Sequence, residues 1–181
     1  MKKIVLILSA VLAFGCSGSD DSSDINQSTN NFFKVNNTTY SITNANINKQ
    51  SSGDGTVFFI TLTNAEVSTS SDGMHAVIPD NLTHLASFTL DMHSVTNQLP
   101  TGTFNFQGDY GFDAYSIQDN IIVEAGQIIS KNVVSDESDF INQDGRIIIT
   151  RTGDNYNFNF NLVTSLGLIQ GQYTGDVTKN Y

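Results

Sequence analysis

The sequence of 181 residues contains no tryptophan, two prolines and a single cysteine. One cysteine cannot form a disulfide within the chain, so a stable fold has to come from a packed core. The apolar runs all fall short of the ~20 residues that a transmembrane helix needs. The lack of tryptophan removes the largest side chain that could stack on a ligand. These absences favour a globular domain without disulfides and with a core of moderate size.

Basic residues are also scarce, with 8 Lys and Arg against 18 Asp and Glu and a formal net charge of -10. Nucleic-acid binding depends on clustered lysine and arginine. Beyond residue 15, the basic residues are scattered singly: Lys34, Lys49, Lys131, Arg146, Arg151 and Lys179. We therefore expect no nucleic-acid partner.

Motifs for catalysis are missing as well. The sequence has no Gly-x-Ser-x-Gly elbow and no phosphate-binding loop, and its one cysteine lies in the N-terminal segment. Two carboxylates brought together by a fold, as in glycoside hydrolysis, leave no trace in a linear sequence. For a domain of this size we nevertheless expect a protein that is not an enzyme and needs no cofactor.

The first residues have the order of an export signal. Lys2 and Lys3 precede an apolar run from Ile4 to Phe14, and Gly15 and Cys16 follow it. A charged start, a short apolar segment and a small residue before a processing point define a signal peptide. A lone thiol in an exported chain needs a partner or a modification, and Cys16 lies where the signal ends.

The segment Leu12-Ala13-Phe14-Gly15-Cys16 resembles the lipobox of bacterial lipoproteins, which implies lipid attachment at Cys16. The usual box has leucine three residues before the cysteine and a small residue two before it, whereas this chain has Ala13 and Phe14. Such looser boxes are typical of Bacteroidota. The following Ser17-Gly18-Ser19-Asp20-Asp21 resembles the acidic surface-export signal of that phylum. The resemblance implies an outer-membrane lipoprotein facing the cell exterior.

The sequence thus divides into a signal peptide (1–15), a lipidated cysteine with a flexible acidic tether (16–31) and a single β-domain (32–181). The tether holds serine, aspartate and asparagine with Ile25 as its one large apolar residue, which cannot make a core. Acyl chains bind a membrane with ~0.8 kcal/mol per buried methylene, so the anchor alone can hold the domain. Removal of Lys2 and Lys3 with the signal changes the charge from -10 to -12.

Apolar residues in the domain recur with a period of two, which predicts strands with one wet face. The segment Tyr156 to Leu162 alternates aromatic or aliphatic residues with asparagine. Ala86 to His93 repeats the design, with Ala86, Phe88, Leu90 and Met92 facing inward. Further strands are predicted at Phe32–Val35, Thr39–Ile47, Val57–Thr63, Thr103–Phe106, Ala114–Ile117, Ile121–Glu124, Ile147–Arg151 and Leu168–Thr174.

Turn residues separate these strands, as in Gly53-Asp54-Gly55 and Gly153-Asp154-Asn155. We find no amphipathic helix that could serve as a crossover between parallel strands. The sequence therefore predicts an all-β fold of about 9–10 strands, either an antiparallel β-sandwich or a flattened lipocalin-like barrel. The segments Gly145–Thr150, Ile169–Gly175 and Leu99–Phe104 resemble strands of small Bacteroidota lipoproteins of uncharacterised function, a resemblance that carries over no catalytic residue.

The segment from Asp109 to Tyr115 is the predicted ligand-binding loop. Tyrosine gives rigid contact area, and carboxylates beside aromatic rings can accept hydrogen bonds from sugar hydroxyls. The residues expected to contact a ligand are Tyr110, Phe112, Asp113 and Tyr115. The alternative is a hairpin whose aromatic rings fold back into the core.

The densest acidic segment lies on a predicted loop from Ser135 to Gly145. Its acids are candidate calcium ligands, namely Asp136, Glu137, Asp139 and Asp144. Their spacing does not match an EF-hand, and the alternative is a solvated turn. His75, His84 and His93 recur every nine residues, but we interpret them as surface histidines and not as zinc ligands.

Two functions remain open. The first is a surface-tethered, non-catalytic module that binds a glycan, another small ligand or a partner envelope protein through loops on a rigid scaffold. The second is a structural or assembly component whose exposed strand edges pair with a neighbouring protein.

Overall fold

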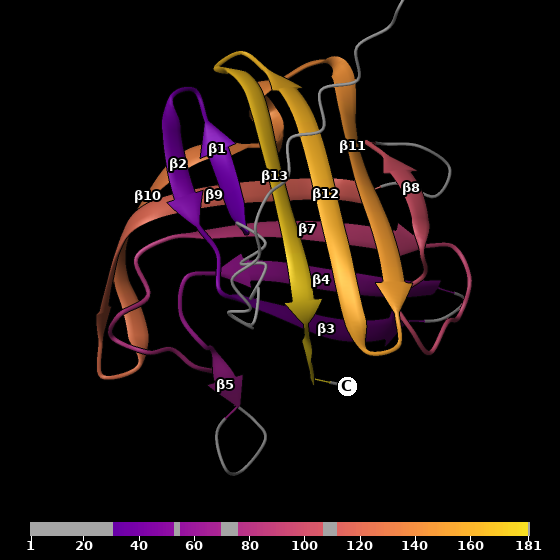
Figure 1. The fold of residues 1–181 in the computed structure, drawn as a ribbon, viewed down its shortest axis with the longest axis horizontal. Helices are drawn as coiled ribbons and strands as arrows, with labels where there is room; N and C mark the ends of the chain where they lie inside the picture. The colour runs from indigo at the N-terminus through magenta and orange to yellow at the C-terminus, as the bar shows by residue number, and fades with distance from the viewer. Residues whose placement is uncertain (1–30, 53–54, 70–75, 107–111, 181) are drawn as a thin grey trace, which may run out of the picture.

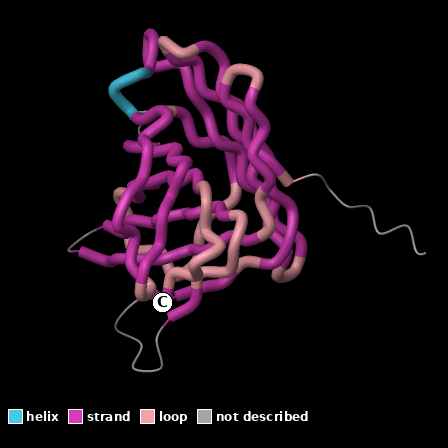
Figure 2. The backbone as a smooth tube through the Cα atoms, turned by 90° about the vertical axis from the view of Figure 1, so that its left-hand side faces the viewer, coloured by secondary structure: helices cyan, strands magenta, loops and turns pink. Residues whose placement is uncertain are grey.

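The computed structural model describes residues 31–52, 55–69, 76–106 and 112–180. Cys16, His75 and Tyr110 lie outside these ranges. Strands dominate the described residues, and Figure 2 shows one short helical turn, η1 (Glu137–Asp139), at the end of the molecule. This agrees with the all-β class that the period-two pattern predicts.

The strands form two six-stranded sheets that lie face to face (Figure 1). The first sheet has the order β2 (Thr38–Ser41), β1 (Phe32–Val35), β13 (Gly167–Asp176), β12 (Asn155–Thr164), β11 (Phe140–Thr152) and β8 (Gly102–Asn105). The second has the order β10 (Gln127–Asp136), β9 (Phe112–Glu124), β7 (Leu85–Met92), β4 (Gly55–Thr63), β3 (Asn44–Ser52) and β14 (Thr178–Asn180). A small ribbon pairs β5 (Ser68–Thr69) with β6 (Ala76–Val77).

The sheets do not close on each other within the described residues, so the sandwich is the correct one of the two predicted architectures. In Figure 1, strands β11 to β13 stand upright in front, and β3, β4 and β7 run across behind them. This is the crossed type of sheet packing. The pairs between named strands are antiparallel, except that β14 runs parallel to β3.

Alternate residues of the strands fill the space between the sheets. Strand β7 is buried at every second position, which confirms the inward assignment of Ala86, Phe88, Leu90 and Met92. Strand β12 does the same, with Tyr156, Phe158 and Phe160 each 1% exposed and its asparagines on the other face. One cluster of aromatic and aliphatic side chains therefore joins the two sheets.

Four strand assignments need correction. The predicted strand Thr39–Ile47 is two strands, β2 and β3, which belong to different sheets. The predicted strands Ala114–Ile117 and Ile121–Glu124 are one continuous strand, β9, in which Asn120 has a φ of 48°. The predicted loop from Ser135 to Gly145 contains η1 and the start of β11. Strand β10 was not predicted because it is an edge strand with irregular register and mostly exposed residues, so it lacks an alternating pattern.

A glycine permits the closest packing in the first sheet. Gly171 on β13 is buried opposite Phe160 of β12. A Cβ atom at this position would lie 2.7 Å from the carbonyl oxygen of Phe32 and would overlap the ring of Phe160. The backbone of β1 cannot give way as a flexible side chain could, so the site admits only glycine without rearrangement.

We predict that Gly171→Ala lowers the free energy of unfolding by about 1–3 kcal/mol, because the added methyl overpacks the core. Gln170→Ala is the matched control, since Gln170 precedes Gly171 and is exposed. It should change stability by about 0.5 kcal/mol or less. The measurement is urea unfolding of both variants. Equal stability of the two variants would contradict this account of the packing.

Candidate functional site

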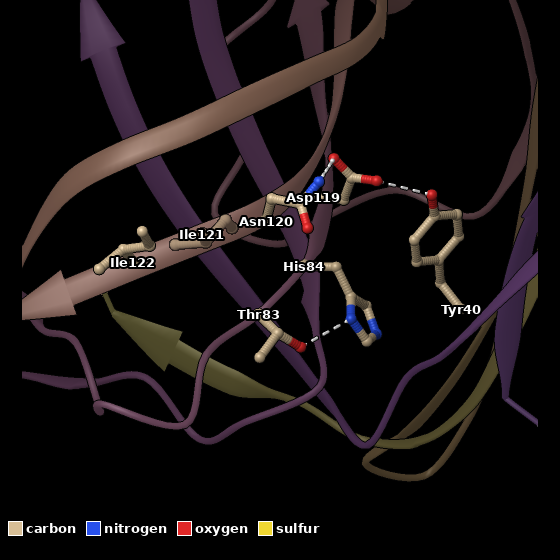
Figure 3. A pocket seen from close by; sticks show the side chains of 7 residues that line it. All are labelled: Tyr40, Thr83, His84, Asp119, Asn120, Ile121 and Ile122. Atoms are coloured by element: carbon tan, nitrogen blue, oxygen red, sulfur yellow. Dashed lines mark hydrogen bonds between the residues drawn. The ribbon is translucent and has the colours of Figure 1, made fainter.

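A pocket of about 440 Å³ opens between the edge of the first sheet and strand β9 of the second. We call it the Tyr40 pocket, and Figure 3 shows its lining side chains. They come from three separate segments of the chain: Tyr40, Thr83, His84, Asp119, Asn120, Ile121 and Ile122. The pocket thus exists only after both sheets have formed.

Tyr40 lies on β2 and forms one wall of the pocket. Its ring stacks on Phe33, with 4.7 Å between centroids and 20° between planes. Its hydroxyl donates a 2.9 Å hydrogen bond to the Oδ2 atom of Asp119. Burial, followed by this hydrogen bond and the charge of Asp119, raises the pKa of Tyr40 to about 12. The phenol is therefore held neutral and in a fixed orientation.

Asp119 connects Tyr40 to the β9–β10 hairpin. Its Oδ1 atom accepts hydrogen bonds from the side-chain amides of Asn132, at 2.9 Å, and Asn120, at 3.2 Å. The carboxylate therefore accepts three hydrogen bonds from side chains, one from Tyr40 on β2 and two from the hairpin. Such an arrangement fixes the position of a charged group before any ligand arrives.

His84 faces Tyr40 across the pocket, with 5.3 Å between the ring centroids (Figure 3). Its Nε2 atom lies 2.7 Å from the carbonyl oxygen of Ser41, which can only accept, so Nε2 donates. In the neutral ring, Nδ1 then accepts a hydrogen bond from the Thr83 hydroxyl at 2.9 Å. The side chain of Asn64 accepts hydrogen bonds from the backbone N–H groups of Thr83 and His84.

The remaining wall combines polar and apolar groups. Asn120 is exposed and has a left-handed backbone, which asparagine tolerates better than most residues. Ile121 is 6% exposed and packs in a second apolar cluster, whereas Ile122 is 52% exposed. An open pocket with amide and carboxylate oxygens, a phenol and an imidazole ring suits a small polyhydroxylated ligand.

Two of the predicted ligand-binding residues lie in the core. Phe112 is 0% exposed and Tyr115 is 2% exposed, so neither ring can contact a ligand at the surface. Tyr115 lies 2.6 Å, Oη to Oγ, from Ser135 in a buried hydrogen bond, and burial raises the pKa of Tyr115 to about 12. Asp113 alone is exposed, and Tyr110 lies outside the described residues. The alternative, aromatic rings folded into the core, is therefore correct for Phe112 and Tyr115.

Three of the four predicted calcium ligands, Asp136, Glu137 and Asp139, lie together at η1, and the fourth, Asp144, lies on β11. Asp136 accepts hydrogen bonds from the backbone and hydroxyl of Ser138, which lower the pKa of Asp136. Asp139 accepts a hydrogen bond from the backbone N–H of Asp136, which completes a capping box on η1. Glu137 lies in η1, and Asp144 lies exposed on β11. The structure thus gives two of these acids a local structural role.

No set of three or more histidine, cysteine or acidic side chains is placed to hold a metal ion within the described ranges. His84 belongs to the Tyr40 pocket, and His93 lies just past the end of β7. Burial and the nearby charge of Asp91 raise the pKa of Asp113, while His93 acts in the opposite direction. This places Asp91, His93 and Asp113 near one another at one end of the second sheet.

The residues that define the pocket were missed by sequence reasoning. Tyr40 was placed within a predicted strand, and His84 was interpreted as a surface residue. Asp119 fell in the gap between two predicted strands. Their separation along the chain, 79 residues between Tyr40 and Asp119, leaves no local spacing that would connect them. Asn120 gave no signal either, because asparagine at 157, 159 and 161 lies in a regular strand.

The raised pKa of Tyr40 makes a testable prediction. The folded protein favours the neutral phenol, so this contribution to stability is full below pH 10 and is lost as the pH rises from 10 to about 12. We expect the phenolate absorbance difference between the wild type and Tyr40→Phe to develop near pH 12. Asp119→Asn should lower the pKa of Tyr40 only in part, because burial is the largest cause of its raised value and remains in this variant. A difference band centred near pH 10 would contradict the buried, hydrogen-bonded phenol.

Within the described part of the chain, no helix is long and apolar enough to cross a membrane. Comparisons with protein-family models, with curated proteins and with solved structures gave no match to this chain.

Proposed function

We propose that this chain is a non-catalytic envelope lipoprotein whose β-sandwich binds a small polyhydroxylated ligand, such as one sugar unit of a glycan, in the Tyr40 pocket. The observation that carries the proposal is the Tyr40–Asp119 hydrogen bond, which crosses between the sheets and fixes a phenol and a carboxylate in an open pocket. Hydroxyl groups donate to carboxylate and amide oxygens and accept from amide N–H groups. His84 and Ile122 add aromatic and apolar surface for the carbon face of a sugar ring.

The proposed location depends on the N-terminal segment. The charged start, the apolar run and Cys16 are typical of a lipoprotein signal, and the polar composition of residues 16–31 favours a flexible link between the anchor and the domain. The acidic residues after Cys16 support export to the outer face of the outer membrane. We propose that the membrane contact is made by the lipid anchor.

A second candidate function is assembly with another envelope protein through strand β10. This strand forms one edge of the second sheet and carries two exposed apolar side chains, Ile129 at 55% and Val133 at 47%. Ile122 on the paired strand is 52% exposed. Exposed edges can accept a strand from a partner, but the three register shifts of β10 twist the edge and oppose such pairing. This favours the ligand-binding module as the first candidate.

To test ligand binding, we would measure the unfolding midpoint of the full chain in detergent with glucose, galactose, mannose, rhamnose and N-acetylglucosamine. We expect at least one sugar to raise the midpoint by several degrees, because a ligand at a hundredfold excess over its dissociation constant adds roughly 2.7 kcal/mol. Asn120→Gly should remove this shift, since the amide is lost while glycine accepts the backbone φ of 48°.

The matched control is Asn36→Gly, because Asn36 also has a positive φ, 54°, and lies in the turn between β1 and β2. It should keep the shift. A panel without any shift, or equal shifts in Asn120→Gly and the wild type, would refute the proposed pocket. Cross-linking in intact cells of the wild type, but not of Val133→Lys, to one other envelope protein would favour the assembly function instead.

The lipid anchor can be tested separately with Cys16→Ser. In cells grown with a radiolabelled fatty acid, we expect label on the wild-type chain and none on the variant, because serine cannot form the thioether. The variant should also leave the membrane fraction. Protease treatment of intact cells then reports exposure at the cell surface. Labelled Cys16→Ser protein would contradict attachment at this residue.

A further inference from the structure

The outer face of the first sheet carries a transverse row of four polar residues from neighbouring strands. Three register pairs form this row. Lys34 on β1 pairs with Gln170 on β13, and Gln170 pairs on its other side with Asn161 on β12. Asn161 in turn pairs with Arg146 on β11. We call this the amide row. It places two amides side by side with a cation at each end, on the face turned toward the viewer in Figure 1.

A shallow depression of about 220 Å³ lies beside this row. Its rim is formed by the row amides and by the next row along the strands, where Phe32, Gln172 and Asn159 are in register. Neighbouring strands lie ~4.8 Å apart and same-face residues of one strand ~6.7 Å apart, so the amides form a grid on the scale of a pyranose ring. The depression is separate from the Tyr40 pocket and shares no residue with it.

Within the described residues, the two cations of the row have no carboxylate partner. Neither Lys34 nor Arg146 forms an ion pair with any carboxylate in the described residues. Asp144, two residues before Arg146 on the same strand, is exposed but does not pair with it. The full sequence has 18 acidic and 8 basic residues, so two cations without a partner among the described carboxylates give this part of the sheet an unusual local charge.

The amides need an explanation of their own, because asparagine is depleted in strands. Strand β12 nevertheless has asparagine at 155, 157, 159 and 161, all on its wet face. The Oδ1 atom of Asn161 is buried without a hydrogen-bond partner in the described residues, which is unfavourable for a polar atom. Asparagine also recurs on β3, at 44, 46 and 48, and the Oδ1 atom of Asn46 is likewise buried without a partner in the described residues. This row differs because it is opposed on β4 by Thr63, Thr61 and Phe59 and so forms no grid of amides with that strand.

From this arrangement we infer that the amide row is a second binding site, which takes an extended acidic glycan chain, that is, a polyhydroxylated chain with carboxylate or sulfate groups. The amides bind ring hydroxyls, and Lys34 and Arg146 bind anionic groups on two sugar units. The cations are three strand spacings apart, on the order of 14 Å, which exceeds one sugar unit and therefore requires a chain. The site lies on a rigid sheet, so it needs no loop rearrangement.

The test is calorimetric titration of the full chain in detergent with three chains: hexagalacturonic acid, a κ-carrageenan hexasaccharide, which carries sulfate and no carboxylate, and maltohexaose as the neutral chain. We expect one or both acidic probes to bind, at least tenfold more tightly than maltohexaose, and the affinity to fall as NaCl rises. Binding of one acidic probe identifies the carboxylate or the sulfate. Absence of binding by both acidic probes, or equal affinity for maltohexaose, overturns the inference.

Lys34→Gln and Arg146→Gln should each weaken binding about fivefold, the upper end for an exposed ion pair. Lys131→Gln is the matched control, an exposed lysine on β10 of the other sheet, and should bind as the wild type does. Unfolding midpoints should be equal in all three variants. If Lys131→Gln weakens binding as much as the others do, attraction is nonspecific and the assigned site is wrong. Asn120→Gly should leave this binding unchanged, which separates it from the Tyr40 pocket.

Discussion

The ring of Phe160 lies against the ring of Phe88, with 4.7 Å between centroids, and this contact joins the centres of the two sheets. Phe160 can take this position because Gly171 leaves room beside it in the first sheet. Phe112 continues the packing from Phe88, and Phe140 packs with Phe112 from the end of the sandwich. A close-packed interior of large rings allows little relative shift of the sheets. The outward side chains are therefore fixed as well.

The second sheet extends beyond this core, and the extension forms the Tyr40 pocket. A smaller apolar cluster of Ala65, Leu82, Ile121 and Val123 fixes the segment before β7 against the β9–β10 hairpin. The backbone hydrogen bond from Ile121 to Thr83 belongs to the same contact. Because Thr83 and His84 are adjacent, packing of Leu82 also determines where the imidazole lies. The apolar cluster thus positions a polar site.

The two proposed binding surfaces lie on different parts of the sandwich, one at its open edge and one on its flat outer face. The Tyr40 pocket lies at an open edge of the sandwich, where residues from different sheets meet around Asp119. The amide row lies on the flat outer face, where neighbouring strands present side chains in register. A net charge of -10 repels anions from most of the molecule, so a local pair of cations has more influence on where an acidic ligand binds.

The strands of the core were predictable because their pattern is local. In Ala86 to Met92 and in Tyr156 to Leu162, alternation alone identifies the buried face, since the side-chain period of a strand is two. Strand β10 was not predictable, because an exposed edge strand imposes no alternation on its sequence. The burial of Phe112 and Tyr115 was not predictable from local sequence either. Aromatic residues beside glycine and acids are compatible with a loop or with a core.

By itself, the sequence determined the acidic charge, the all-β class and the inward face of the main strands. These depend on composition or on residues near one another in the chain. Only the tertiary structure decided between sandwich and barrel, brought Tyr40 to Asp119 across 79 residues, and aligned Lys34 with Arg146. The physical reason is register. Which residues become neighbours across strands depends on how the strands pair, and many pairings are compatible with one alternating pattern.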